Sequence, residues 1–441
     1  MTQTAGKSLL HAVLKSLSGR YLVYITQLIS MMVLARIFSP EQMGIFAVIQ
    51  VFATFFLLFS EMGLAPAIIN QERLDRRDRD GIFSFTLWVG LAIFLIFLLF
   101  SPLIASFYQR DIYLFLCLPV AVSVIFSALT IVPIASLQKD KRFITLGKCD
   151  GLAELFSLGA VVLASLWLDL LWALAIKPLV VAAVRFFLCW LASADTSNGR
   201  ASFGRHLAAV KPLLGFSAYQ LAFNILNYFS RNLDNMLVGK YLSMQNLGVY
   251  DQAYRIMRYP LLLFTFALTP AIQPVLTTLK EDKRKFEHLH HKFVIYLAML
   301  GTVGGIAVYL FSPLIVDIIL GQKWQDVVPV LQVLALSIPI QTVLSTSGGF
   351  YQAAGRTDLL FKCGVFSSIT AVSAIIYGIW QGELLAICWA LLISFSVNFF
   401  QCYYLMAKHI FPGGYVRFIA RILPCIIANA GFIAYVSLNM G

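Results

Sequence analysis

The chain is poor in charged residues. Only 12% of its 441 residues are Asp, Glu, Lys or Arg, whereas about a quarter are charged in an ordinary soluble domain, and 60% are hydrophobic. This balance excludes a water-soluble globular domain. Apolar runs longer than about 18 residues recur along the whole chain, and each of them predicts a helix that crosses a membrane.

Signatures of catalysis and of nucleotide binding are also missing. The chain has no Gly-x-x-x-x-Gly-Lys-Ser/Thr phosphate loop, so nothing in the sequence points to ATP. None of the seven cysteines forms a Cys-x-x-Cys motif, and we interpret them as small core residues. No cofactor and no metal are therefore expected. The first apolar stretch contains Arg20 and has no small-residue cleavage site, which predicts a permanent span instead of a signal peptide.

Short strings recur at nearly constant distances, which indicates an internal duplication. Phe-Ser-Pro-Leu-Ile occurs at residues 100–104 and again at 311–315. Near the start of the chain the copies are offset by 204 residues, and later by 214. At the second offset the matching residues are Gln138, Arg142, Lys148 and Cys149 with Gln352, Arg356, Lys362 and Cys363. Transporters are often built from two such repeats with the substrate path between them.

The apolar runs predict thirteen spans. They lie at residues 14–37, 43–70, 81–107, 113–137, 143–168, 171–192, 210–240, 247–278, 289–319, 326–353, 358–380, 383–408 and 415–438. We therefore predict an all-α polytopic membrane protein with two six-helix lobes, related as a parallel repeat, plus one extra C-terminal helix. The predicted domains are a lobe at 1–192, a cytoplasmic linker at 193–209, a lobe at 210–408 and the additional helix at 409–441.

Basic residues concentrate in alternate loops. One set of loops holds 21 of the 33 Lys and Arg residues and the other set holds 4, while the remainder fall within or beside the spans. By the positive-inside rule the N-terminus is cytoplasmic. The same rule explains the net charge of +12 as membrane topology, and no nucleic acid partner is expected.

Polar residues form stripes on two of the predicted spans. On the seventh span, five of them follow at steps of 4, 3, 4 and 3 and so share one helical face: Gln220, Asn224, Asn227, Arg231 and Asp234. At the offset of 204, the first span carries Ser16, Arg20, Gln27 and Ser30. A charge at mid-bilayer costs about 2.5–3.5 kcal/mol. We therefore predict that the two stripes face each other and line a wet cleft between the lobes.

The charges within the spans suggest an anionic substrate. Arg20, Arg231 and Arg255 are our candidates for binding phosphate, because the guanidinium group offers a rigid fork of donors.

Acidic residues at depth are candidates for binding a coupling cation or proton, and they are Glu61, Asp234 and Asp251. A purely structural role stays open as well. Arg231 and Asp234 are three residues apart, and Asp251 and Arg255 are four apart, so both sets have the spacing of simple ion pairs on one helix.

Four strings in the right order give the chain a resemblance to a known family. They are Leu-Ala-Arg-Ile-Phe-Ser-Pro-Glu-Gln-Met-Gly at 34–44, Phe-Ser-Glu-Met-Gly-Leu at 59–64, Ser-Arg-Asn-Leu-Asp-Asn-Met-Leu-Val-Gly-Lys at 230–240 and Gly-Arg-Thr-Asp at 355–358. Over nearly its whole length the chain resembles the polysaccharide transporter branch of the multidrug/oligosaccharidyl-lipid/polysaccharide exporter superfamily, and in particular the Wzx-type flippases. Many members of that superfamily have fourteen spans, one more than is predicted here.

The resemblance implies a V-shaped bundle of two lobes that works by ion-coupled alternating access. It implies that a polyprenyl-pyrophosphate-linked oligosaccharide crosses from the inner to the outer leaflet of the bacterial cytoplasmic membrane, for lipopolysaccharide or exopolysaccharide synthesis. Membrane lipid, a polysaccharide polymerase and the chain-length machinery are the further partners it suggests.

Two alternatives remain open on the sequence. A cation-coupled multidrug exporter of the same superfamily would share the lobes, although the basic residues in the spans favour an anionic cargo. A membrane polysaccharide polymerase or ligase would need a large loop or catalytic carboxylates and histidines. The longest predicted loop, at 192–205, is short, and His288, His290 and His291 are predicted to lie in a cytoplasmic loop. We therefore do not expect an enzyme.

Overall fold

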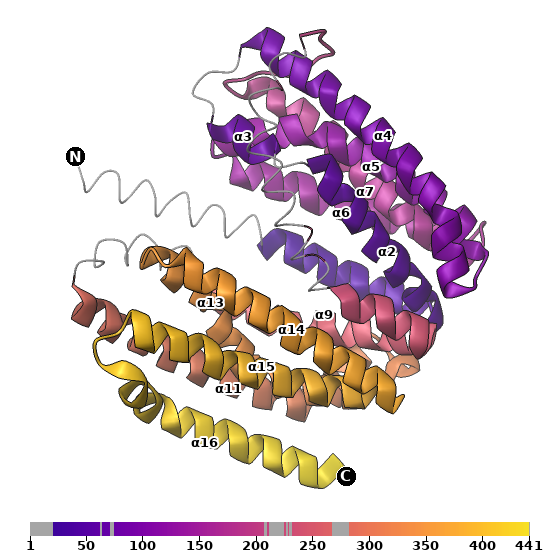
Figure 1. Ribbon diagram of the computed structural model, residues 1–441. Helices are drawn as coiled ribbons and strands as arrows, with labels where there is room; N and C mark the ends of the chain where they lie inside the picture. Colours follow the sequence, from indigo (N-terminus) through magenta and orange to yellow (C-terminus); the bar gives the residue numbers. More distant parts are fainter. Residues whose placement is uncertain are drawn as a thin grey trace. The chain divides into compact units, whose positions relative to one another are not determined.

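The computed structural model describes residues 21–61, 64–70, 75–206, 210, 225, 228, 232–266 and 282–440, and every regular element within these ranges is a helix (Figure 1). The chain divides into two compact units, Met1–Lys240 and Tyr241–Gly441. The predicted domain boundary after residue 192 remains a prediction, because most residues between 207 and 231 lie outside the described ranges.

The first unit is organised around α5. Its described helices are Tyr21–Ile37, α2 (Pro40–Glu61), α3 (Leu64–Asn70), α4 (Arg76–Tyr108), α5 (Ile112–Lys139), α6 (Phe143–Ala164), α7 (Leu170–Ala192), the short η1 (Ser193–Asp195) and residues 232–240. α5 packs against α2, α3, α4 and α7, and α6 packs against α7. The central place of α5 explains why its side chains are apolar nearly all round.

The second unit is organised around α11. Its described helices are α9 (Met244–Phe266), α11 (Lys283–Ile319), η3 (Gln322–Trp324), α12 (Val327–Ala335), α13 (Ile338–Ala353), α14 (Thr357–Gln381), α15 (Leu384–His409) and α16 (Gly414–Met440). α11 packs against α9, α12, α13 and α16, while α14 and α15 pack as a pair.

The internal repeat is visible in the helix boundaries. The last residues of α5 and α13 are 214 residues apart, and so are the first residues of α6 and α14 and those of α7 and α15. The turns also match, since Lys141 has φ 56° and Gly355 has φ 71°. In these turns the Arg142 N–H donates to the Leu137 carbonyl at 2.9 Å, and the Arg356 N–H donates to Tyr351 at 2.9 Å. The duplication predicted from the strings therefore extends to the backbone.

Within the described ranges, eight helices are long and apolar enough to cross a membrane, or nine if one bent pair counts as a span. The polytopic all-α prediction is confirmed, while the count of thirteen remains a prediction. The single span predicted at 326–353 is broken, because α12 and α13 meet at an angle of 56°. Pro339 has no N–H to donate to Ala335, and the turn before it is held by the Ser337 N–H, which donates to the Leu334 carbonyl at 3.0 Å.

The connector after α7 is fastened to the helix ends of the first unit. The Asp80 carboxylate accepts hydrogen bonds from the backbone N–H of Ser202 at 3.0 Å and from its hydroxyl at 2.9 Å. The Asp140 carboxylate accepts the same two bonds from Ser197, each at 2.6 Å. Arg79 is buried and donates to the Asn198 carbonyl. The predicted linker is therefore ordered over residues 193–206.

Each copy of the Phe-Ser-Pro-Leu-Ile string places a proline inside a long helix, next to a serine that compensates for its missing N–H. Pro102 lies inside α4 and Pro313 inside α11, and a proline cannot donate to the carbonyl four residues earlier. In both copies the preceding serine donates to that carbonyl instead, Ser101 to Leu98 and Ser312 to Tyr309, each at 2.8 Å. The lipid of a bilayer offers no other donor to these carbonyl groups. The serine hydroxyl therefore supplies the hydrogen bond that each long helix would otherwise lack at its proline.

We expect Ser312→Ala to lower the free energy of unfolding by about 1–3 kcal/mol, because the Tyr309 carbonyl then loses its donor in a buried position. The double variant Ser312→Ala/Pro313→Ala should regain most of the loss, since residue 313 again supplies an N–H. Thermal unfolding midpoints of the purified protein measure both effects. Ser437 makes the same type of bond, to Ala434 at 2.9 Å, but is exposed and is not followed by proline, so Ser437→Ala is the matched control. Equal losses for Ser312→Ala and Ser437→Ala would contradict this account.

Candidate functional site

Half of the predicted site lies outside the described residues. This holds for Arg20, Gln220, Asn224, Asn227 and Arg231. The two facing stripes and the wet cleft between them consequently remain a prediction.

The described part of the first stripe has one exposed and one buried side chain. Gln27 is exposed on the helix Tyr21–Ile37. Ser30 is 2% exposed, and its hydroxyl has no hydrogen-bond partner among the described residues. Glu61 is the last residue of α2, and its side chain lies outside what the structure describes.

Asp234 is half-buried on the helical residues 232–240, and its Oδ1 accepts the backbone N–H of Asn235 at 2.8 Å. This part of the seventh predicted span belongs to the first unit. The Tyr108 hydroxyl of α4 donates to the Met236 carbonyl at 3.1 Å and ties the segment to that helix.

The structure brings Asp251 and Arg255 together on α9. Arg255 Nε donates to Asp251 Oδ2 at 2.7 Å, as the spacing of four residues allows. The Asp251 side chain is 12% exposed and that of Arg255 is 47% exposed. A buried carboxylate therefore holds a guanidinium group that solvent or a ligand can reach. One turn further on, Arg258 lies over the Tyr254 ring, 5.9 Å from its centroid.

Other charges within predicted spans pair across two helices of the first unit. Lys177 Nζ on α7 lies 2.7 Å from Glu154 Oε1 on α6, and Arg185 Nε lies 2.7 Å from Asp150 Oδ1. Asp150 and Glu154 are one turn apart, so the two ion pairs form successive rungs between antiparallel helices. The Lys177 and Glu154 side chains are 16% and 11% exposed, which marks this pair as part of the packing and not as an open binding group.

The structure corrects the prediction that His288, His290 and His291 lie in a loop, while their cytoplasmic side remains a prediction. His288, His290 and His291 lie inside α11, which begins at Lys283, and the rings of His290 and His291 are buried. Arg421 Nη1 of α16 lies 2.8 Å from His291 Nδ1. The Gly413 N–H donates to Glu287 Oε2 at 3.0 Å. The predicted span begins only at residue 289, although apolar positions continue with helical spacing through the charged residues before it.

No group of three His, Cys, Asp or Glu side chains in the described ranges is placed to hold a metal ion. The seven cysteines are all free thiols, and six of them are buried.

The helices and the repeat define the class of protein as a multi-pass α-helical membrane protein with a duplicated core. Residues 33–329 match the family described as polysaccharide biosynthesis protein, which is more than half of the chain. The chain belongs to this family. The resemblance stated from the four sequence strings is thereby confirmed.

The chain is similar to several named relatives along most of its length. It is 26% identical over 381 residues to the teichuronic acid biosynthesis protein TuaB of Bacillus subtilis, covering 85% of this chain and 77% of the relative. It is 24% identical to the lipopolysaccharide biosynthesis protein WzxC of Escherichia coli, covering 89% of this chain and 79% of that protein.

Two solved structures show the same fold. The lipid II flippase MurJ in an inward closed conformation matches with a TM-score of 0.74 at 14% identity, over 96% of this chain and 99% of MurJ. An inward-facing multidrug resistance MATE family transporter matches with a TM-score of 0.64 at 14% identity, over 90% of this chain and 98% of that one. The predicted fold class is confirmed by these matches.

The Glu154–Lys177 pair gives a test of the packing role. Glu154→Gln leaves a buried ammonium group without its partner, so we expect the free energy of unfolding to fall by about 3 kcal/mol. The reversed pair Glu154→Lys/Lys177→Glu should recover part of the loss. Glu41→Gln is the control, because Glu41 and Arg110 form an exposed pair at 2.8 Å. A loss no larger for Glu154→Gln than for Glu41→Gln, in thermal unfolding of the purified protein, would overturn the assignment.

Proposed function

We propose that the protein is a flippase that moves a polyprenyl-pyrophosphate-linked oligosaccharide from the inner to the outer leaflet of the bacterial cytoplasmic membrane. Its family is one of polysaccharide biosynthesis. A further relative, 24% identical over 82% of this chain, is the probable low-salt glycan biosynthesis flippase Agl15 of Haloferax volcanii. The similarity to TuaB, WzxC and the fold of MurJ supports a cargo that joins a lipid to a sugar.

The proposed mechanism is based on the Asp251–Arg255 ion pair of α9. The Arg255 guanidinium is held at one edge by the buried Asp251, while nearly half of its side chain is exposed. A planar guanidinium offers paired donors to a phosphate oxygen. In this proposal Arg255 meets the pyrophosphate in the second unit, and Arg20 and Arg231 meet it elsewhere along the path.

Ion coupling is part of the same proposal. When Arg255 also binds the pyrophosphate, the buried Asp251 carboxylate loses part of the compensation for its charge, and a bound proton or cation would relieve that cost. Glu61 and Asp234 are the further candidates for this role. Binding of the anion and binding of the ion would thus be linked, as ion-coupled transport requires.

We also propose an orientation in the membrane and two protein partners. The N-terminus lies in the cytoplasm, because the 21 basic residues of one set of loops remain on that side. A polysaccharide polymerase and the chain-length machinery would receive the oligosaccharide on the outer side. We further propose that the protein is a transporter and carries out no reaction of its own.

A multidrug exporter is the second candidate, since the MATE transporter shares the fold. The exposed arginine disfavours it, because a cationic drug would be repelled. Efflux of cationic dyes from cells with and without the protein separates the two. Dye efflux that depends on the protein, together with no movement of the lipid-linked sugar, would favour the exporter.

Arg255→Ala should reduce transport about tenfold or more, because a charge-assisted hydrogen bond to the pyrophosphate is lost. The assay uses the full-length protein in liposomes and follows a fluorescent polyprenyl-pyrophosphate oligosaccharide between leaflets. Arg258→Ala is the matched control, since it removes the same charge from the same helix at a residue stacked on Tyr254. Equal rates for the two variants, with equal incorporation into the liposomes, would remove Arg255 from the path.

The topology can be tested with two exposed lysines. Lys285 lies at the start of α11 and Lys323 in η3, at the other end of the same helix. In intact cells, a membrane-impermeant maleimide should label Lys323→Cys and not Lys285→Cys, because the basic loop stays in the cytoplasm. Permeabilised cells should show labelling of both. Labelling of Lys285→Cys alone in intact cells would invert the orientation.

A further inference from the structure

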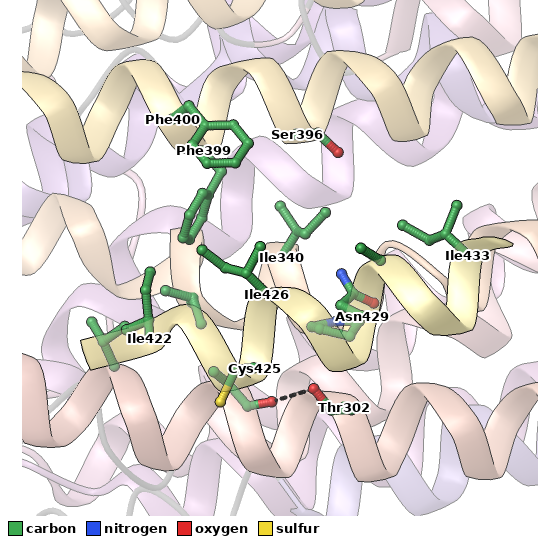
Figure 2. A pocket seen from close by; sticks show the side chains of 15 residues that line it. Thr302, Ile340, Ser396, Phe399, Phe400, Ile422, Cys425, Ile426, Asn429 and Ile433 are labelled. Carbon is green, nitrogen blue, oxygen red and sulfur yellow. Dashed lines mark hydrogen bonds between the residues drawn. The ribbon is translucent and has the colours of Figure 1, made fainter. Parts of the chain in front are cut away.

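A cavity of about 190 Å³ lies inside the second unit, between α16 and the helices α11, α13 and α15 (Figure 2). Its wall is mostly apolar and includes Ile426 and Ile433 of α16, Ile340 of α13 and Phe399 of α15. An engineered protein cavity of about 150 Å³ takes up benzene, so the space suffices for an apolar group of ring size or slightly more.

One polar side chain in this wall, that of Asn429, lacks a hydrogen-bond partner for its amide oxygen within the described part of the chain. Asn429 lies near the middle of α16, is 8% exposed and places its amide against the cavity (Figure 2). Its Oδ1 has no hydrogen-bond partner among the described residues. The two hydroxyl groups in the wall already donate to backbone carbonyls of their own helices. Thr302 donates to the Ala298 carbonyl at 2.7 Å and Ser396 to the Leu392 carbonyl at 2.9 Å. A buried amide in this state costs free energy that a bound polar atom would recover.

We propose that the cavity binds a lipid alcohol, an apolar chain or ring that carries one hydroxyl, with the hydroxyl paired to Asn429. A hydroxyl both donates and accepts, so it can pair with either end of the amide. The apolar remainder would pack against the isoleucines and Phe399 of the wall.

The depth of the site selects this class of ligand. α16 is one of the candidate membrane spans, and Asn429 lies near its middle. The head group and the ester oxygens of a phospholipid stay at the membrane surface, so only its tail would reach this depth and the amide would stay unpaired. A molecule dissolved in the bilayer that carries its own hydroxyl meets both requirements. Arg255 is not among the residues that line the cavity, and the inference does not depend on the proposed transport function.

The experiment compares two probes on the full-length protein in phosphatidylcholine nanodiscs. One probe is a diazirine-bearing benzyl alcohol, whose ring matches the size of the cavity, and the other is its methyl ether, which cannot donate a hydrogen bond. After illumination, labelled peptides are located by mass spectrometry. We expect saturable labelling of α11 and α16 by the alcohol, competition by unlabelled benzyl alcohol, and apparent affinity about fivefold or more weaker for the ether.

Three variants sharpen the test. Asn429→Leu removes the amide at similar volume and should abolish the preference for the alcohol over the ether. Ala298→Leu adds bulk at a wall position of α11 and should reduce labelling by both probes. Ile427→Leu is the matched control, because Ile427 is on α16 but 61% exposed, and it should change neither result.

Two outcomes would overturn the proposal. Equal affinity of wild-type protein for the alcohol and the ether would show a pocket for apolar tails alone. Labelling of α16 that never saturates would show contact with bulk lipid, with only water in the cavity. Both comparisons use the wild-type protein, so they stand even if a variant fails to fold.

Discussion

The bilayer supplies no hydrogen-bond partner, and the structure follows from this constraint. Every backbone carbonyl and every charge within a span has to find its partner inside the protein. The long helices α4 and α11 meet the requirement at their prolines, where the serine before each proline donates to the carbonyl that the proline leaves unpaired. The same pairing of serine and proline occurs in both copies of the duplicated chain.

Charges within the spans divide into two kinds under this constraint. Between α6 and α7, two ion pairs join opposite charges on neighbouring helices, so these pairs bind the helices together. On α9 the pair lies within one helix, and the arginine has far more exposure than its carboxylate. The first kind fixes a scaffold. The second kind is the pair on α9, where the buried Asp251 carboxylate positions the exposed Arg255 side chain. An arginine held in this way could bind an anionic ligand.

Much of the fold could be predicted from the sequence, because an apolar run of span length has only one stable conformation in a membrane. The predicted span 143–168 corresponds to α6 at Phe143–Ala164, and 171–192 to α7 at Leu170–Ala192. The break between α12 and α13 was missed because both halves are apolar, and only Pro339 signals it. The first turns of α11 lie outside the predicted span 289–319 because their charged residues favour a loop.

The candidate site was harder to predict. Spacing along one helix sufficed for Asp251 and Arg255, whose pairing was an open alternative on the sequence. The partners of Lys177 and Arg185 lie on another helix, and no spacing rule gives the rotation of one helix against the next. The sequence does not mark Asn429 as a site residue, because a single amide in an apolar run is common. Its importance follows only from its buried oxygen in the wall of the cavity, which has no partner among the described residues. Most of the two polar stripes lies beyond the described residues and remains a sequence prediction.

The most direct test of the account is the fate of the lipid-linked oligosaccharide when the protein is removed from living cells. Depletion of the protein, followed by enzymatic labelling of sugars on each face of the cytoplasmic membrane, measures how much of this lipid lies in each leaflet. The account predicts accumulation in the inner leaflet and loss of the corresponding surface polysaccharide. An unchanged distribution between leaflets, with normal surface polysaccharide, would contradict it.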